Sequence, residues 1–229
     1  VKNLRNAQGG ENAPSLDELR GKVPAARNAQ SRIVTREDLL ARVYTMPSNF
    51  GRVFRAGVRS NPDNPLATQL FIISRDNSKR LVVSPDTLKL NLRTYLNQFR
   101  LISDAIDILD AQVINIGLTF QVATDPNTNR NGAVQSIISD LRSYFDIKNF
   151  QIDQPISISD VTNIIINSPG VISIVELKFL NQRGLTLERQ YSEVSFDVTA
   201  NTYKGLIVGP PGSIFEMRFA EHDISGYAV

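Results

Sequence analysis

The chain has no cysteine, a single histidine and only two methionines among its 229 residues. Without cysteine it has no disulfide framework, no thiolate nucleophile and no Cys-based zinc or iron–sulfur site. A histidine-based catalytic triad or a multi-histidine metal site cannot be built from this chain alone, because His222 is the only histidine. We expect His222 to be an exposed residue near the C-terminus.

An excess of one charge and long apolar runs are also lacking. The 25 Lys+Arg and 23 Asp+Glu residues leave a net charge of +2, whereas a dedicated nucleic-acid binder usually has a strong basic excess. No apolar run approaches the roughly 18 to 20 residues that span a bilayer, so we expect a soluble protein with no membrane partner. The apolar content of 41% is sufficient for one large or two small globular cores.

The first half of the chain predicts a polar linker followed by an α+β domain. Residues 1–31 carry glycine and proline among polar side chains, with one short helix at Ser15–Arg20. Residues 32–111 predict the order α-β-β-α-β. The evidence is a helix capped by Thr35 and Asp38, strands in "FGRVFRAGVR" and "ATQLFIIS", a helix begun by Ser84-Pro85, and the short strand "AIDIL".

The second half predicts another domain of similar size and an extended arm. Strict alternation of apolar and polar residues from Ile114 to Val122 indicates a strand with one buried face. Two amphipathic helices and the strand "VISIVELKFL" follow, so residues 112–182 predict β-α-β-α-β. Residues 183–229 contain short extended pieces between Gly and Pro and predict a β-rich C-terminal arm. The expected fold class is α+β, with two successive sandwich-like units.

Patterns typical of catalysis or ion binding are missing or broken. Neither of the glycine-rich nucleotide-binding fingerprints occurs between a strand and a helix. The stretch "DPNTNRNG" begins like a calcium loop, but Arg130 stands where the loop needs glycine and Ser136 where it needs glutamate, which favours a turn. No nucleophile has a base to activate it, so we expect no enzyme activity, no metal and no cofactor.

Three arginines mark the first expected strand as a candidate interface. Arg52, Arg55 and Arg59 cluster with Phe50 and Phe54 on this strand, as in a nucleic-acid platform of aromatics and cations. However, strand alternation places Arg52 and Arg59 on opposite faces, and the RNA-recognition strand pattern is not matched. We favour a protein–protein edge with salt bridges and keep a nucleic-acid or ligand-binding module as the alternative.

A second candidate interface is an apolar run near the C-terminus. The run contains Ile214, Phe215, Met217 and Phe219 and is separated from the preceding residues by Pro210-Pro211-Gly212. Such a patch needs a cover, because each of these side chains gains about 1.5 to 3 kcal/mol when it is fully buried. The hypothesis is an assembly arm that pairs with another subunit. Folding back onto the second sheet of its own chain is equally compatible with the sequence.

Three long stretches occur in a characteristic order. They are "AQGGENAPSLDELRGKVPAARNAQSRIVTREDLLARV", "LISDAIDILDAQVINIGLTFQV" and "ISISDVTNIIINSPGVISIVEL". This ordered series resembles the baseplate-J-like family, which includes the baseplate wedge subunit of contractile-tailed phages. The resemblance covers most of residues 1–180, and the sequence after Gly184 has no counterpart in it.

The resemblance implies a structural role. Members of the family build the inner wedge ring around the tail hub and tube and hold wedge partners together. By that resemblance the partners are copies of the chain itself and other wedge or hub proteins, with no nucleic acid. The expected location is the tail baseplate of a virion that is assembled in the host cytoplasm.

Overall fold

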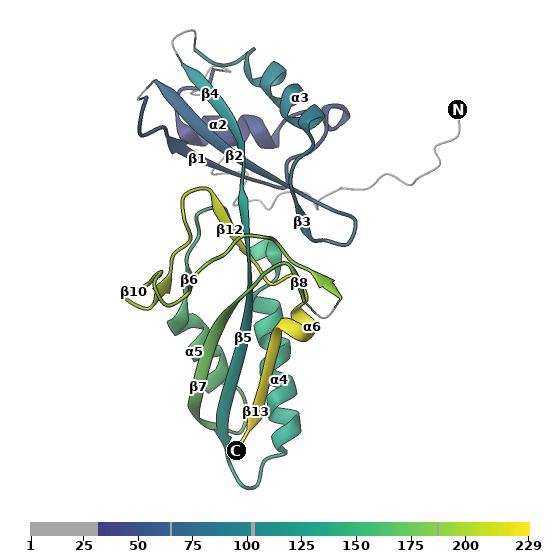
Figure 1. Cartoon of the computed structure of the whole chain (residues 1–229), viewed down its shortest axis with the longest axis vertical. Helices are drawn as coiled ribbons and strands as arrows, with labels where there is room; N and C mark the ends of the chain where they lie inside the picture. Colours follow the sequence, from purple (N-terminus) through teal and green to yellow (C-terminus); the bar gives the residue numbers. More distant parts are fainter. Residues whose placement is uncertain (1–31, 65, 102–103, 187) are drawn as a thin grey trace, which may run out of the picture. The chain divides into compact units, whose positions relative to one another are not determined.

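The structure is a computed structural model that describes residues 32–64, 66–101, 104–186 and 188–229 (Figure 1). The expected linker at 1–31, with its short helix, lies outside the described residues. The chain divides into two compact units, Val1–Ala111 and Gln112–Val229. Both units contain helices and sheets, and the C-terminal part is rich in short strands, which confirms the predicted α+β class.

The first unit is a small sheet with two helices against it. Strand β2 is central, with β1 antiparallel and β4 parallel to it, and β3 pairs antiparallel with the end of β2. Its core is made of apolar residues from α2, α3 and the sheet, including the fully buried Leu70, Ile72 and Leu92. The elements are α2 (Arg36–Tyr44), the 3-10 helix η1 (Ser48–Phe50), β1 (Arg55–Ser60), β2 (Ala67–Arg75), β3 (Leu81–Val82), α3 (Asp86–Leu96) and β4 (Ala105–Asp110).

The start of α2 is fixed by the predicted capping box. The Thr35 hydroxyl accepts the Asp38 N–H at 3.1 Å, and the Asp38 carboxylate accepts the Thr35 N–H at 3.0 Å. These two bonds satisfy backbone donors that a helix start otherwise leaves without partners.

We expect Thr35→Ala to lower the free energy of unfolding of the first unit by about 1 kcal/mol, because the N-cap acceptor is lost. Chemical denaturation followed by circular dichroism measures the change. Thr94→Ala is the matched control, since the exposed Thr94 hydroxyl donates only to the Leu90 carbonyl within α3. Equal effects of the two substitutions would contradict the capping argument.

Two local predictions in the first unit are corrected. The first strand begins at Arg55 rather than at Phe50, because residues 48–50 form a 3-10 helix. Pro85 rather than Ser84 is the N-cap of α3. The buried Ser84 hydroxyl instead lies 2.9 Å from the hydroxyl of Ser74 on β2, a bond between two distant segments that local sequence does not signal.

The second unit is built around the long strand β5 (Gln112–Thr124), which alternates as predicted. Its even-numbered residues from Ile114 to Val122 are at most 2% exposed. Helices α4 (Arg130–Tyr144) and α5 (Ile158–Ile166) contribute their own buried apolar residues to this core. Strand β7 (Val171–Gln182) pairs antiparallel with β5 and is interrupted by two register shifts.

The remaining elements of the second unit are short. The 3-10 helix η2 (Ile147–Asn149) precedes a three-stranded sheet in the order β10-β11-β6, and β8 and β9 form a separate pair. These strands are β6 (Ile156–Ser157), β8 (Leu185–Thr186), β9 (Arg189–Gln190), β10 (Thr202–Tyr203) and β11 (Leu206–Ile207). In the described part of the chain, no helix has both the length and the apolar character that a membrane span requires.

The C-terminal residues complete the second sheet, and this corrects the prediction of a separate arm at 183–229. Strand β12 (Ser213–Glu216) pairs in parallel with the start of β5, and β13 (Ile224–Ala228) pairs in parallel with its end. The short helix α6 (Ala220–Asp223), which the sequence did not predict, lies between them. The segment therefore joins its own sheet, the alternative that the sequence left open.

Candidate functional site

The predicted arginine interface is only partly assembled on one strand. Arg55 and Arg59 lie on β1, and because they are four residues apart they share one face of it. Arg52 precedes the strand and is exposed. The argument that alternation separates Arg52 from Arg59 therefore does not apply, since Arg52 is not part of the strand.

Of the two aromatic residues in the stretch 50–59, Phe50 lies on η1, outside the strand, and Phe54 is already stacked with two cations. The guanidinium carbons of Arg55 and Arg75 lie over its ring, 4.4 and 4.5 Å from the ring centroid. The Arg55 guanidinium also donates to the Phe54 carbonyl at 3.1 Å. A base-stacking platform needs an open ring face. The two guanidinium groups occupy the stacking surface of Phe54.

We expect no single-strand binding that depends on Phe54. Loss of a stacked base costs about 1 to 3 kcal/mol in single-strand binders, so an active platform would lose about tenfold or more in affinity on Phe54→Ala. We expect this substitution to leave the fluorescence anisotropy titration of a labelled oligonucleotide unchanged. A tenfold weakening relative to the wild-type chain would support the nucleic-acid alternative.

The second candidate interface is buried within its own unit. Ile214, Phe215 and Met217 are at most 9% exposed, because β12 packs beside β5 and the Phe215 ring contacts Phe196 at 5.6 Å between centroids. Phe219 is half-buried, and its ring lies 5.2 Å from the ring of Tyr191. The first three residues therefore offer no surface to a partner, and their interpretation as an interface is wrong.

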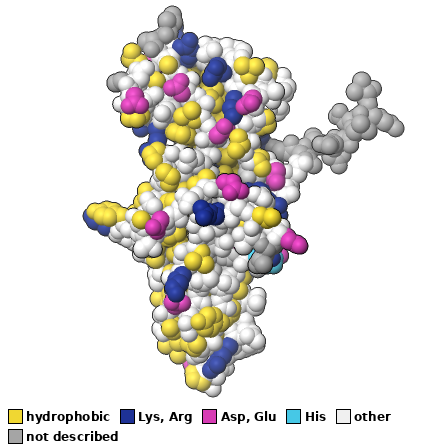
Figure 2. Space-filling view, in the orientation of Figure 1, with side chains coloured by type: hydrophobic (Ala, Val, Ile, Leu, Met, Phe, Trp, Pro, Cys, Tyr) yellow, Lys and Arg dark blue, Asp and Glu magenta, His cyan; other side chains and the backbone are white. Residues whose placement is uncertain are grey.

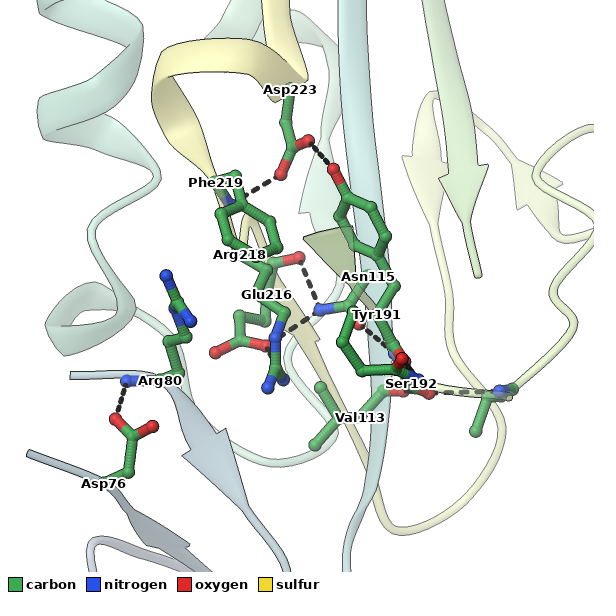
Figure 3. Close-up of polar contacts among 12 residues, drawn as sticks. Asp76, Arg80, Val113, Asn115, Tyr191, Ser192, Glu216, Arg218, Phe219 and Asp223 are labelled. Carbon is green, nitrogen blue, oxygen red and sulfur yellow. Dashed lines mark hydrogen bonds and ion pairs between the residues drawn. The ribbon is translucent and has the colours of Figure 1, made fainter. Parts of the chain in front are cut away.

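A polar cluster fixes this C-terminal segment to β5 (Figure 3). It comes from three parts of the second unit: the strand β5, the stretch after β9, and the segment from β12 to α6. All its carboxylate, amide and phenol groups are at most 5% exposed. We define the polar cluster as Asn115, Tyr191, Ser192, Glu216, Arg218 and Asp223.

Asn115 is the centre of the polar cluster. It faces away from the apolar side of β5, stands opposite Glu216 in the parallel pairing, and is 0% exposed. Its amide nitrogen donates to the Glu216 carboxylate at 2.8 Å, and its amide oxygen accepts the Ser192 N–H at 2.7 Å. The Arg218 guanidinium lies 3.4 Å from the same carboxylate. One side chain thus joins two distant stretches of chain to β5.

The second part of the cluster is a tyrosine–carboxylate pair. The Tyr191 hydroxyl donates to Asp223 at 2.6 Å, and the other Asp223 oxygen accepts the Phe219 N–H at 2.7 Å. Burial raises the pKa of Asp223 above its usual value, despite these hydrogen bonds, which lower it. Burial, followed by the hydrogen bond to Asp223, raises the pKa of Tyr191 to about 12. The pair holds α6 against the stretch after β9.

The raised pKa of Tyr191 predicts a loss of stability in alkali. A phenol whose pKa rises from 10.0 to about 12 on folding contributes stability that is complete below pH 10 and is lost as the pH rises through about 12. We expect the wild-type second unit to lose stability more steeply than Tyr191→Phe between these pH values. Thermal melts at stepped pH measure both slopes. Parallel slopes would contradict the prediction, and Tyr203→Phe, at an exposed tyrosine, is the control.

The groups of the polar cluster bond to one another and to the backbone, so they hold segments of the chain together. The Ser192 hydroxyl donates to the Val113 carbonyl at 2.6 Å and accepts the Val194 N–H, so it is held by the backbone rather than by a base. Within the described ranges there is no group of three or more His, Asp or Glu side chains placed to hold a metal. His222 is exposed on α6.

The polar side chains of the stretch that begins like a calcium loop accept hydrogen bonds from backbone N–H groups. The Asp125 side chain accepts the Asn127 N–H at 2.8 Å, and the Asn129 side chain caps α4 by accepting the Gly132 N–H at 3.2 Å. These bonds agree with the turn that the sequence predicted.

Only weak signals in the sequence point to the polar cluster. Asn115 lies on the polar face of an alternating strand, a face that is expected to be either in water or in contact with other residues, and Glu216 interrupts an apolar run. A carboxylate inside such a run is the signal that could have been used, since buried charges are almost always paired. The partner residue lies 101 positions away, and local pattern does not identify it.

Comparison with known proteins supports a likeness of fold. No protein-family model matches the chain, and no curated protein matches it in sequence. Among solved structures, a chain of the anti-feeding prophage (AFP) baseplate, determined by cryo-EM with six-fold symmetrisation, is similar, with a TM-score of 0.52 and 10% sequence identity. The match covers 96% of this chain and 43% of that one, so this chain spans less than half of the baseplate chain. Membership of the baseplate-J-like family stays a prediction.

Proposed function

We propose that this protein is a structural subunit of the baseplate of a contractile phage tail or a phage-like injection machine. The observation that carries the proposal is the likeness of fold to an AFP baseplate chain over 96% of the present chain. The ordered series of stretches that resembles baseplate-J-like proteins supports the same class of machine independently, because it was recognised from sequence. The role is one of assembly, not of catalysis.

Within the baseplate, the position that we propose for the chain is the inner wedge ring. There it surrounds the hub and tube and holds wedge partners together through contacts between proteins, including contacts with copies of itself. Its location is the tail baseplate, after assembly in the host cytoplasm. The polar cluster fits such a role. Because it fixes the C-terminal segment to β5, the second unit presents one defined surface to its neighbours.

The alternative, a nucleic-acid or ligand-binding module that uses residues 50–59, has less support. Phe54 is stacked by Arg55 and Arg75, and Arg52 lies outside the strand.

Immuno-electron microscopy of purified contractile particles tests the proposal. We expect an antibody against this chain to label the baseplate end of particles from producing cells, and to leave particles from a strain that lacks the gene unlabelled. Labelling along the tail shaft or on the head, or absence of the chain from particles, would overturn it. The same particles dissociated in stages test the ring assignment, because an inner ring subunit stays with the hub after peripheral proteins have been removed.

A further inference from the structure

The hairpin of β10 and β11 stands out from the second unit. Its turn and its second strand are held to the rest of the unit, because the Ile158 N–H of α5 donates to the Gly205 carbonyl in the turn at 2.9 Å and β11 pairs with β6. The inward row of its small sheet is anchored by Ile156 and Ile207, which are 0% exposed. In Figure 2 this region forms a knob with yellow side chains and a dark blue tip, at the place of the β10 label in Figure 1.

Two side-chain hydrogen bonds hold the start of the hairpin to the residues that precede it, although the Lys204 side chain at its turn is exposed. The Thr202 hydroxyl donates to the Val198 carbonyl at 2.6 Å, and the Asn201 side chain donates to the Asp197 carbonyl at 2.7 Å. Lys204 and Gly205 have φ values of +49° and +78°, as the two central residues of a type I′ hairpin turn do.

The outward row of the hairpin is apolar with one positive charge. Tyr203 and Leu206 stand opposite each other and are 66% and 39% exposed, and Val208 continues the row at 44%. Lys204 lies at the turn, with its ammonium 5.1 Å from the Tyr203 ring centroid. It is the only charged residue between 198 and 215. A rigid aromatic anchor beside a cation is typical of a protein–protein contact.

Strand β4 of the first unit carries the complementary pattern. Its odd-numbered residues Ala105, Asp107 and Leu109 are exposed, whereas Ile106 and Ile108 pack against the core. One carboxylate thus lies between two apolar side chains, at the strand spacing of about 7 Å from residue i to i+2. Among the described strands β4 pairs only with β2, and β10 pairs only with β11, so each has an edge toward which a further strand can be added.

We propose that the β10–β11 hairpin of one copy docks on β4 of a second copy. Tyr203 and Leu206, which are cross-strand neighbours, then lie together against Leu109, and the Lys204 ammonium at the turn pairs with the Asp107 carboxylate, two residues along β4. The two surfaces are different, so the contact is head-to-tail, and its repetition generates a ring when the rotation closes. The inference deepens the proposed function, on which it rests, by naming the surfaces through which copies of the subunit meet.

Charge reversal in the full-length chain tests the docking. Analytical ultracentrifugation measures the self-association constant of the wild type, of Lys204→Glu, of Asp107→Lys and of the double variant. We expect each single reversal to weaken association about fivefold or more and the double variant to restore it, because the pair is then re-formed with opposite signs. Lys79→Glu is the matched control, since Lys79 is also an exposed lysine with positive φ at a hairpin turn.

The apolar half of the contact is tested at Tyr203. We expect Tyr203→Ser to weaken association about tenfold or more, as for a buried aromatic anchor. A photo-crosslinking phenylalanine analogue at position 203 should give intermolecular products within residues 105–110. Unchanged melting transitions exclude a folding defect in each variant.

Several results would overturn the docking. They are no self-association at the highest soluble concentration, cross-links outside β4, or a double variant no better than the single ones. Particle labelling keeps this outcome separate from the proposed function. A Tyr203→Ser chain that still enters baseplates normally would remove the docking inference and leave the baseplate role, whereas hairpin-dependent association of a chain that is absent from particles would do the reverse.

Discussion

Deletion of residues 210–229 is expected to abolish the cooperative unfolding of the second unit and to leave that of the first unit in place. The deletion removes Ile214, Phe215, Met217 and Ile224, which are at most 9% exposed, and it uncovers one side of β5. Each of these side chains contributes about 1.5 to 3 kcal/mol when buried, and together they approach the whole stability of a domain, about 5 to 15 kcal/mol.

Differential scanning calorimetry separates the two units in this experiment. The truncated chain should keep only the unfolding transition of the first unit. Its second unit should bind a dye that detects exposed apolar surface. Tyr227→Ser is the control, because Tyr227 lies on β13 but is 58% exposed and should leave both transitions intact. Survival of the transition of the second unit after truncation would mean that β12 and β13 are dispensable, as a detachable arm would be.

Asn115→Asp is expected to destabilise the second unit by about 3 to 5 kcal/mol at pH 7, although the two side chains have nearly the same shape. The substitution removes the amide donor to Glu216 and places a second carboxylate within hydrogen-bonding distance of the first. Two buried carboxylates at this distance cannot both ionise cheaply, so the pKa of one of them rises.

The pH dependence of the destabilisation by Asn115→Asp shows whether the charge of the new carboxylate causes it. A carboxyl whose pKa is raised on folding contributes stability that is present below its unfolded value, about 4, and is lost as the pH rises through its folded pKa. The defect should therefore shrink in acid and grow toward neutral pH. Denaturant titrations at several pH values measure it against Asn163→Asp on the exposed side of α5. A defect independent of pH would point to lost geometry rather than to charge.

The local sequence pattern was sufficient to predict the elements that are stabilised by residues close to one another in the sequence. The Thr35 capping box, the alternation of β5 and the helices that follow it each depend on residues within one turn or one strand, and each was predicted. The α+β class follows from their order. The first strand was extended too far because Phe50 and Arg52 fit an alternation that a 3-10 helix interrupts.

The polar cluster and the placement of the C-terminal segment depend on contacts between distant residues. Glu216 meets Asn115 across 101 positions, and Tyr191 meets Asp223 across 32. An apolar run such as Ile214–Phe215 shows that burial is needed, but its periodicity does not say which strand provides it. Parallel pairing with β5 requires a long crossover, and no local turn announces it.

The parallel pairing of β12 and β13 with β5 also sets the order of events during synthesis. Every strand and helix of the first unit has been made once residue 110 is added, so that unit can fold while translation continues. Strand β5 follows directly, but its neighbours on one side are not made until residues 213–228, about a hundred residues later at a rate of about 5 to 20 residues per second. For those seconds one edge of β5 is open on the ribosome, and the nascent chain depends on chaperones or on speed to keep that edge from other strands.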